Sequence, residues 1–190
     1  MRTHILILSL IVAGMPLAAT AQSAPAAATT HAVPAYVTTA INDPARAADK
    51  ADDARRQMAA VMTFSGVKPG DTVIELSPGS GYWTRVFSAI VGPRGHVYDV
   101  WPTEYAKVDG EDVTTTQQLV AEPHYANVSA LTQPAAKFEV PEPVDLVFTV
   151  QNYHDYFDPF MGPTDIAAFN KQVFAALKPG GVFVIIDHAA

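Results

Sequence analysis

The chain has 190 residues, 49% hydrophobic and 16% charged, so it is long enough for one globular domain with a substantial core. Its formal charge of -7, with no basic cluster beyond Arg55-Arg56, argues against nucleic acid as a partner. It has no cysteine, which excludes disulfides and thiolate metal sites and leaves stability to the core.

The first 21 residues have the pattern of a secretory signal peptide. Arg2 and His4 precede a short apolar segment, 5–13, and small residues at 19–21 offer a cleavage site before Gln22. The apolar run is well short of the ~20 residues that a bilayer requires, so an uncleaved anchor is the weaker interpretation and no membrane span is expected after cleavage. The sequence therefore predicts an exported protein, periplasmic or secreted.

The segment after the cleavage site is rich in alanine and proline. Residues 22–40 are expected to be a disordered tether, because they offer little large apolar surface. Residues 41–190 are then expected to form the domain. Asp43 predicts a helix N-cap with Pro44 at the first helical position, and the helix is expected to continue over 47–64.

The next stretch combines a strand, a glycine-containing turn and the start of a helix. The apolar run at 72–76 is typical of a central strand of a parallel sheet. Glu75 interrupts this run, and a carboxylate there is costly to bury unless it pairs within the protein or faces a ligand. Residues 78–81 then turn the chain, and from Trp83 the apolar residues follow a helical period that ends at Gly92-Pro93. A site is expected at this turn.

Strands and helices are predicted to alternate along the rest of the chain. The patterns predict further strands at 96–100, 128–131, 144–150 and 182–186, and helices at 114–122 and 166–177. Thr164 is the predicted cap of the last helix, and Lys178 to Gly181 a turn. Near-continuous apolar strands alternating with helices indicate an α/β fold with a doubly wound, mostly parallel sheet. In such sheets ligands bind outside the carboxyl ends of the strands.

Three segments resemble the class I S-adenosylmethionine-dependent methyltransferases. Residues 75–81, Glu-Leu-Ser-Pro-Gly-Ser-Gly, resemble the E/D-x-G-x-G-x-G signature of that family. Residues 145–147, running on to Tyr153-His154, resemble its fourth strand and exit, and residues 177–187 are similar to its L-K-P-G-G turn and fifth strand. With the signal peptide, the chain looks most like exported predicted methyltransferases whose substrates are not established.

The resemblance implies a Rossmann-like sheet of the methyltransferase type, with S-adenosylmethionine as cofactor. Family members usually continue past the fifth strand into a helix and an antiparallel hairpin, so this chain is expected to lack the C-terminal strands. Residues 182–186 would then form an apolar edge strand, a predicted site for pairing with a second copy.

The resemblance also implies which residues hold the cofactor. The backbone of residues 77–81 would lie against its methionine part, with Glu75 near its amino group. The acid that usually holds the ribose falls at Trp101, and Asp99 or Glu104 are possible substitutes. Gln133-Pro134 occupies the place of the acid near the adenine. The expected cofactor-binding residues are Glu75, Ser77, Pro78, Gly79, Gly81, Asp99, Trp101, Gln151 and Asn152.

Polar residues leave the fourth and fifth strands, which should be neighbours. One hypothesis makes His154 a general base that takes a proton from a substrate hydroxyl, with Asp155 or Asp187 orienting it. A second, less favoured hypothesis is a divalent cation held by Asp155, Asp187 and Asn152. The third is structural: Asp155 caps a turn, His154 packs near Tyr153 and Asp187 ends a strand.

Two functions remain open. The first is methyl transfer from S-adenosylmethionine to a small-molecule acceptor, in which positioning does most of the catalysis. The alternative is a ligand-binding or interaction protein that kept the fold and lost the reaction, since a fold does not fix a function.

Overall fold

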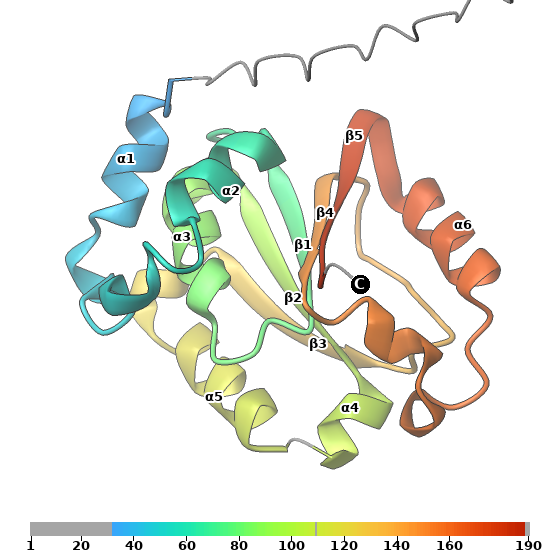
Figure 1. Cartoon of the computed structure of the whole chain (residues 1–190). Coiled ribbons are helices and arrows are strands. Elements are labelled where there is room, and N and C mark those ends of the chain that lie inside the picture. Colours follow the sequence, from blue (N-terminus) through green and yellow to red (C-terminus); the bar gives the residue numbers. More distant parts are fainter. Residues whose placement is uncertain (1–31, 109, 189–190) are drawn as a thin grey trace, which may run out of the picture. The chain divides into compact units, whose positions relative to one another are not determined.

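The computed structural model of the protein describes residues 32–108 and 110–188, all within one unit that runs from residue 31 to 190 (Figure 1). The predicted signal peptide and residues 22–31 of the predicted tether lie outside the described residues. Helix α1 (Ala35–Ile41) buries Val37 completely and Ala40 almost completely. The prediction of a disordered tether is therefore wrong for residues 35–40, because this alanine-rich segment packs one face against the core.

The centre of the fold is a five-stranded sheet. Its strands are β1 (Thr72–Leu76), β2 (His96–Pro102), β3 (Val128–Gln133), β4 (Val144–Val150) and β5 (Leu177–Ile186). They are parallel throughout, in the order β3-β2-β1-β4-β5. This arrangement confirms the predicted α/β doubly wound, parallel sheet. The strand order reverses between β1 and β4, and such a switch point is where open α/β sheets bind ligands.

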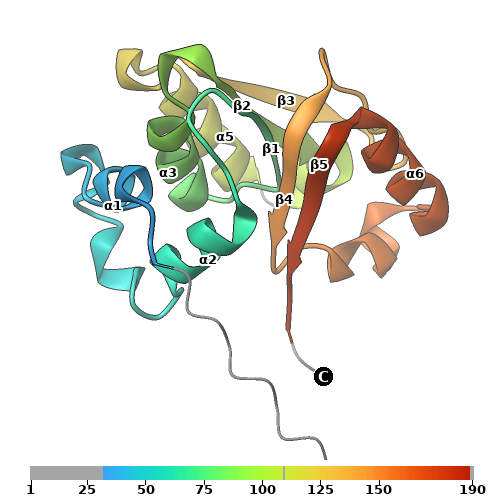
Figure 2. The same ribbon diagram turned by 90° about the horizontal axis from the view of Figure 1, so that it is seen from above.

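Each face of the sheet carries its own hydrophobic cluster. One face is covered by α1, α2 (Met58–Ser65), α3 (Tyr82–Val91) and α5 (Gly110–Val120), and the other by α6 (Ile166–Ala176), as Figure 2 shows. Helix α4 (Thr103–Val108) follows β2. The 3-10 helices are η1 (Pro44–Arg46), η2 (Lys50–Asp52), η3 (Gly92–Arg94), η4 (Pro123–Tyr125), η5 (His154–Phe157) and η6 (Pro159–Met161). Two apolar clusters explain why β1 and β4 are apolar on both sides.

The segment before α2 differs most from the sequence-based expectation. Asp43 does cap η1, accepting a hydrogen bond from the Ala45 amide at 2.8 Å. The predicted continuous helix over 47–64 is wrong, because the chain forms η1 and η2 and then turns at Gln57, whose φ of 51° is left-handed. The cause is tertiary: the buried Arg46 donates to the Ile41 carbonyl at 2.7 Å and to Asp53 at 2.8 Å, and the segment curls around this side chain.

Smaller differences affect three other elements. Helix α4 was not predicted, and α5 begins at Gly110 rather than at residue 114. Asp165, not Thr164, caps α6 by accepting a hydrogen bond from the Ala168 amide. Lys178 to Gly181, predicted as a turn, belongs to β5, whose register against β4 shifts at this place.

Strand β5 is the edge of the sheet formed by the described residues. Val182 and Ile185 are 45% and 41% exposed on it. Pairing of this edge with a second copy stays a prediction. Within residues 32–108 and 110–188, none of the helices has both the length and the apolar character needed to cross a bilayer.

Candidate active site at the carboxyl ends of the strands

A cavity of about 280 Å³ opens at the carboxyl ends of β1, β2 and β4. It lies at the switch point of the sheet, where the fold predicts a ligand. Seven of the nine residues predicted to bind the cofactor line it: Glu75, Ser77, Pro78, Gly79, Trp101, Gln151 and Asn152. The structure thus brings together side chains from three strand ends that are up to 77 residues apart in the sequence.

The loop between β1 and α3 forms one wall of this cavity through an unusual backbone. Ser77, Gly79 and Gly81 all have positive φ angles, of 50°, 59° and 82°. Glycine adopts this region without strain, but a serine does so at a cost. Ser77 is the position at which the signature motif has a glycine, and Gln151, across the cavity, is also left-handed, with φ of 60°. Two strained residues therefore face the same cavity, a pattern found at functional sites.

Side chains of both α3 and α5 hold this loop in place. The hydroxyl of Thr116 donates to the carbonyl of Gly79 at 2.9 Å, and Arg85 donates to the carbonyl of Ser80 at 3.0 Å. A Cβ on Gly81 would lie 2.7 Å from Cδ1 of Leu119. Gly81 therefore permits close packing of the loop on α5, rather than lining the cavity itself.

Glu75 belongs to a buried pair of acids. It lies beside Asp99 in the register of β1 and β2, and the two side chains are 2% and 0% exposed. The Thr84 hydroxyl lies 2.8 Å from Oε2 of Glu75 and 3.2 Å from both carboxylate oxygens of Asp99. Burial raises the pKa of Asp99 to about 8, and burial together with the charge of Asp99 raises the pKa of Glu75. One proton is therefore retained by this pair near neutral pH.

A second cavity of about 340 Å³ adjoins the first. The two share the wall residues Arg56, Trp83, Val150 and Gln151. Asp187, at the end of β5, lines the second cavity. The two cavities therefore meet where strands β4 and β5 end, which is where the polar strand-end residues gather.

His154 lies beside this second cavity without lining either cavity. Its Nδ1 is 2.8 Å from Oδ1 of Asp187, and its Nε2 is 3.2 Å from Oδ1 of Asp155. Burial opposes ionisation of Asp187, but hydrogen bonds from the His188 amide and from His154 outweigh it and lower the pKa of Asp187. The structure therefore places His154 in contact with both Asp187 and Asp155, the other two predicted catalytic residues.

Comparison with known proteins identifies the family. The family model for protein-L-isoaspartate(D-aspartate) O-methyltransferase matches residues 30–121. The ubiquinone/menaquinone biosynthesis C-methyltransferase UbiE of Vibrio campbellii is 30% identical over 127 residues, 66% of this chain and 44% of that protein. A crystal structure of an S-adenosylmethionine-dependent methyltransferase from Aquifex aeolicus superposes with a TM-score of 0.53 at 25% identity, covering 80% of this chain and 70% of that one. The chain belongs to the class I S-adenosylmethionine-dependent methyltransferases.

The same fold occurs in the YcgJ protein from Bacillus subtilis, with a TM-score of 0.53 at 20% identity, covering 68% of this chain and 49% of that one. The chain spans less than half the length of the curated relatives that it matches. The comparisons therefore establish the family and the fold of this methyltransferase and leave its acceptor open.

The acids predicted to hold the ribose lie elsewhere than predicted. Asp99 is fully buried against Thr84, and Glu104 accepts a hydrogen bond from the Ala135 amide at 2.8 Å. Neither substitute acid lines the cavity. Trp101 does, with its indole nitrogen donating to Thr116 at 3.2 Å.

Seven wall residues were absent from the sequence-based set of cofactor ligands. They are Arg56, Ser80, Tyr82, Trp83, Tyr105, Asp112 and Val150. Trp83 is also 5% exposed, which agrees with its place at the start of the apolar period predicted for this helix. Asp112 supplies a carboxylate from α5, near the loop: a Cβ added to Gly79 would lie 3.7 Å from its Oδ2. Its one sequence signal is its position in the first turn of a helix that was expected to begin later.

The side chains that could hold a metal ion in the structure are not the set that the sequence suggested. Among the described residues, His154, Asp187 and His188 offer ligand atoms within 4.8 Å of one another. Asp155, which the sequence suggested as a ligand, is outside this group.

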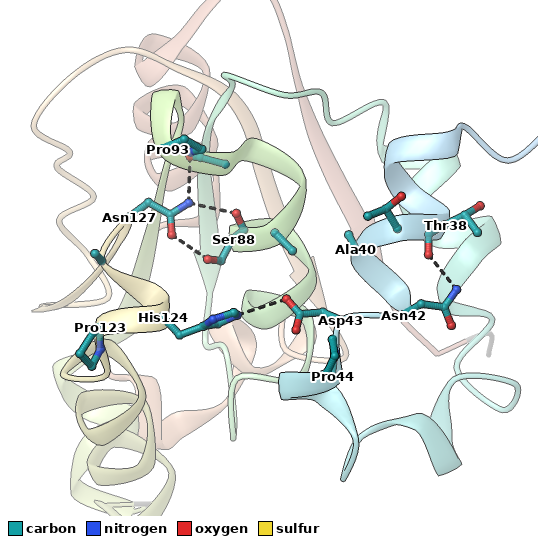
Figure 3. Close-up of a pocket in the computed structure, with 14 residues that line it drawn as sticks. Thr38, Ala40, Asn42, Asp43, Pro44, Ser88, Pro93, Pro123, His124 and Asn127 are labelled. Atoms are coloured by element: carbon teal, nitrogen blue, oxygen red, sulfur yellow. Dashed lines mark hydrogen bonds and ion pairs between the residues drawn. The ribbon is translucent and has the colours of Figure 1, made fainter.

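A further cavity of about 870 Å³ lies away from the strand ends, between α1, α3 and η4 (Figure 3). Its polar side chains bond to one another. His124 lies 3.1 Å from Asp43, and the Ser88 hydroxyl donates to Asn127 at 2.7 Å. None of the predicted site residues lines this cavity.

Proposed function

We propose that this protein transfers a methyl group from S-adenosylmethionine to a small-molecule acceptor. The observation that supports the proposal most directly is the cavity at the switch point, where the signature loop, Glu75 and Asn152 converge. The residues fit the methionine end of the cofactor, because the buried Ser77 hydroxyl oxygen has no hydrogen-bond partner among the described residues. A ligand polar group at that position would satisfy it.

Each wall of the cavity has a role in this proposal. The Glu75 carboxylate holds the amino group of the cofactor, and the amides at the start of α3 favour its carboxylate. Asp112 takes the ribose hydroxyls in place of an acid at the end of β2. When bound, the cofactor supplies an electrophilic methyl group on a sulfonium. The work of the chain is then to align the acceptor with that methyl group and to exclude water.

His154 acts as the general base in this scheme. The acceptor oxygen or nitrogen would give up its proton to Nε2 of His154 as it takes the methyl group that the bound cofactor would supply. Asp187 holds Nδ1 at 2.8 Å during this transfer. Since Nε2 faces Asp155 at 3.2 Å, the imidazole must first turn away from that carboxylate.

We also propose that the protein is exported, because residues 1–21 have the composition of a signal peptide. Export favours a second candidate function, a protein that binds a ligand in this fold without catalysis. The replacement of the acid at the end of β2 by Trp101 also supports this candidate. The two candidates make different predictions for cofactor binding.

Calorimetric titration of the purified protein with S-adenosylmethionine should give saturable heat below millimolar concentration. The substitution Glu75→Gln should weaken binding at least tenfold, because it removes the negative charge facing the amino group. Glu139→Gln, at an exposed ion pair with Lys137, is the matched control and should leave binding unchanged. Absence of heat at millimolar cofactor would refute the proposed methyl transfer and favour the non-catalytic candidate.

The substitution His154→Ala should lower the rate of methyl transfer about 100-fold, the size of a general-base contribution. Cofactor affinity should not change, because His154 does not line the cofactor cavity. The measurement is single-turnover transfer of radiolabelled methyl groups, with a small-molecule extract as the source of acceptors. His124→Ala, an exposed histidine beside the cavity of Figure 3, is the control. Equal rates for both variants would remove His154 from the mechanism.

A further inference from the structure

Three buried polar atoms without hydrogen-bond partners among the described residues belong to side chains that line one cavity. They are the Ser77 Oγ, the Trp83 Nε1 and the Arg56 Nε. All three side chains line the first cavity, and Arg56 and Trp83 also line the second. A buried donor that makes no hydrogen bond is costly, so native proteins rarely leave one without reason. Two such donors at one boundary indicate a missing acceptor group.

The arginine in this wall differs from its neighbours. Arg46 pairs with Asp53 at 2.8 Å, and Arg55 pairs with Asp52 at 2.8 Å. Arg56 has no carboxylate within 4.0 Å in the part of the chain that the structure describes. Its guanidinium lies 4.6 Å from the centroid of the Tyr82 ring instead. A ring face orients a cation without neutralising its charge, so Arg56 keeps a full positive charge at the cavity wall.

Other contacts fix the two donors in place. The Tyr82 hydroxyl donates to Asp53 at 2.6 Å, which holds the ring beneath Arg56. The Trp83 ring is 5% exposed and packs edge-on against Tyr82 and Phe148, with centroids 5.0 and 5.7 Å apart. An indole N–H can only donate. An anion bound by both groups would satisfy the indole N–H and the guanidinium together.

The second cavity has the size and lining of a small-molecule pocket. Its volume of about 340 Å³ falls in the range of ligand sites. Val61, Val150 and Ile186 give it apolar surface, and Asp187, the partner of His154, also lines it. The second cavity is therefore lined by the donors Arg56 and Trp83, by apolar side chains, and by Asp187, the partner of the predicted general base.

We propose that this second cavity is the acceptor pocket and that the acceptor is a small molecule with an apolar body and a carboxylate. The carboxylate binds the Arg56 guanidinium and the Trp83 indole N–H, and a different group of the acceptor receives the methyl. The inference rests on the proposed function, because it assigns the acceptor class for the same site. The carboxylate of the cofactor is the other anion that could bind Arg56. The experiment below distinguishes it from the carboxylate of the acceptor.

Benzoate is a suitable probe, since it is a small apolar body with one carboxylate. The protein is first titrated with S-adenosylhomocysteine, and benzoate is then added to the saturated complex while tryptophan fluorescence and heat are followed. Benzoate should bind saturably, and benzyl alcohol, its neutral counterpart, at least tenfold more weakly. Arg56→Gln should weaken benzoate binding at least tenfold and leave S-adenosylhomocysteine affinity within twofold. Trp83→Phe, which removes the N–H donor together with part of the buried ring, should weaken benzoate severalfold.

Arg55→Gln is the matched control, because Arg55 lines the same cavity but is already paired with Asp52. It should change benzoate binding less than threefold. The proposal is overturned if benzoate does not bind saturably, or if the variants at 55 and 56 behave alike. It is also overturned if Arg56→Gln weakens S-adenosylhomocysteine and spares benzoate, which would assign Arg56 to the cofactor. If S-adenosylhomocysteine itself fails to bind while benzoate binding still depends on Arg56, the anion pocket stands and the proposed methyl transfer fails.

Discussion

The substitution Asp99→Asn is expected to stabilise the protein at alkaline pH by a few kcal/mol. Asp99 is completely buried beside Glu75, and burial raises the pKa of Asp99 from 3.8 to about 8. Each unit of pKa shift corresponds to about 1.4 kcal/mol of free energy of unfolding. Asparagine has the shape of the protonated acid and never ionises, so it removes the cost of a buried charge.

The direction of the pH dependence follows from proton binding. Between pH 3.8 and about 8 the unfolded chain has released the Asp99 proton while the folded chain retains it, so stability falls as pH rises. Above the folded pKa both states are ionised and this contribution no longer changes. The gain in stability of Asp99→Asn over the native protein should therefore be clearly smaller near pH 5 than near pH 8.5. Urea unfolding at the two pH values measures the difference.

The control for this substitution is Asp158→Asn, an exposed aspartate, which should shift stability equally at both pH values. An Asp99→Asn effect that is the same at pH 5 and pH 8.5 would show that Asp99 does not hold a proton in the folded state. The charge of Asp99, once it ionises, also raises the pKa of Glu75, which lines the cavity at the strand ends. Near pH 6 Asp99 still holds its proton, so Asp99→Asn should favour the ionised Glu75 only near and above pH 8.

The parts of the fold that the sequence predicted are those governed by local pattern. The run at β1 is short, evenly apolar and followed by glycines, and it predicted both the strand and the turn. The helix expected over 47–64 failed because its conformation depends on Arg46, a charged side chain that is 1% exposed. No periodicity reveals that an arginine is buried, since its burial requires Asp53 and the Ile41 carbonyl to meet it in three dimensions.

The residues of the candidate site also fall into those that local sequence patterns predicted and those that they did not. Residues of the signature loop and of the β4 exit were predictable, because parallel strands end at one edge. Asp99 was expected to face a ligand, but alternation along β2 turns it toward Thr84 on α3. Arg56 and Asp112 reach the cavity from segments whose helices were predicted with the wrong bounds. Their placement depends on helix packing, which a single sequence does not encode locally.

The substitution Asp53→Ala is expected to lower the free energy of unfolding by about 3 kcal/mol, the cost of leaving a buried charge without its partner. Asp53 accepts hydrogen bonds from Arg46 and Tyr82 at 2.8 and 2.6 Å. Burial opposes its ionisation, but these two hydrogen bonds outweigh burial and lower the pKa of Asp53. Without the carboxylate, Arg46 keeps only the Ile41 carbonyl at 2.7 Å and a distant contact with Asp49.

The neighbouring residue provides the control. Asp52 pairs with Arg55 at the same 2.8 Å distance, but these side chains are 47% and 66% exposed. Asp52→Ala should cost less than about 1 kcal/mol, because water replaces an exposed ion pair. Asp53→Asn should fall between the two, since it retains an acceptor for Arg46. Equal urea midpoints for Asp52→Ala and Asp53→Ala would contradict this order. Because Tyr82 also supports Arg56, Asp53→Ala should in addition weaken benzoate binding, whereas Asp52→Ala should not.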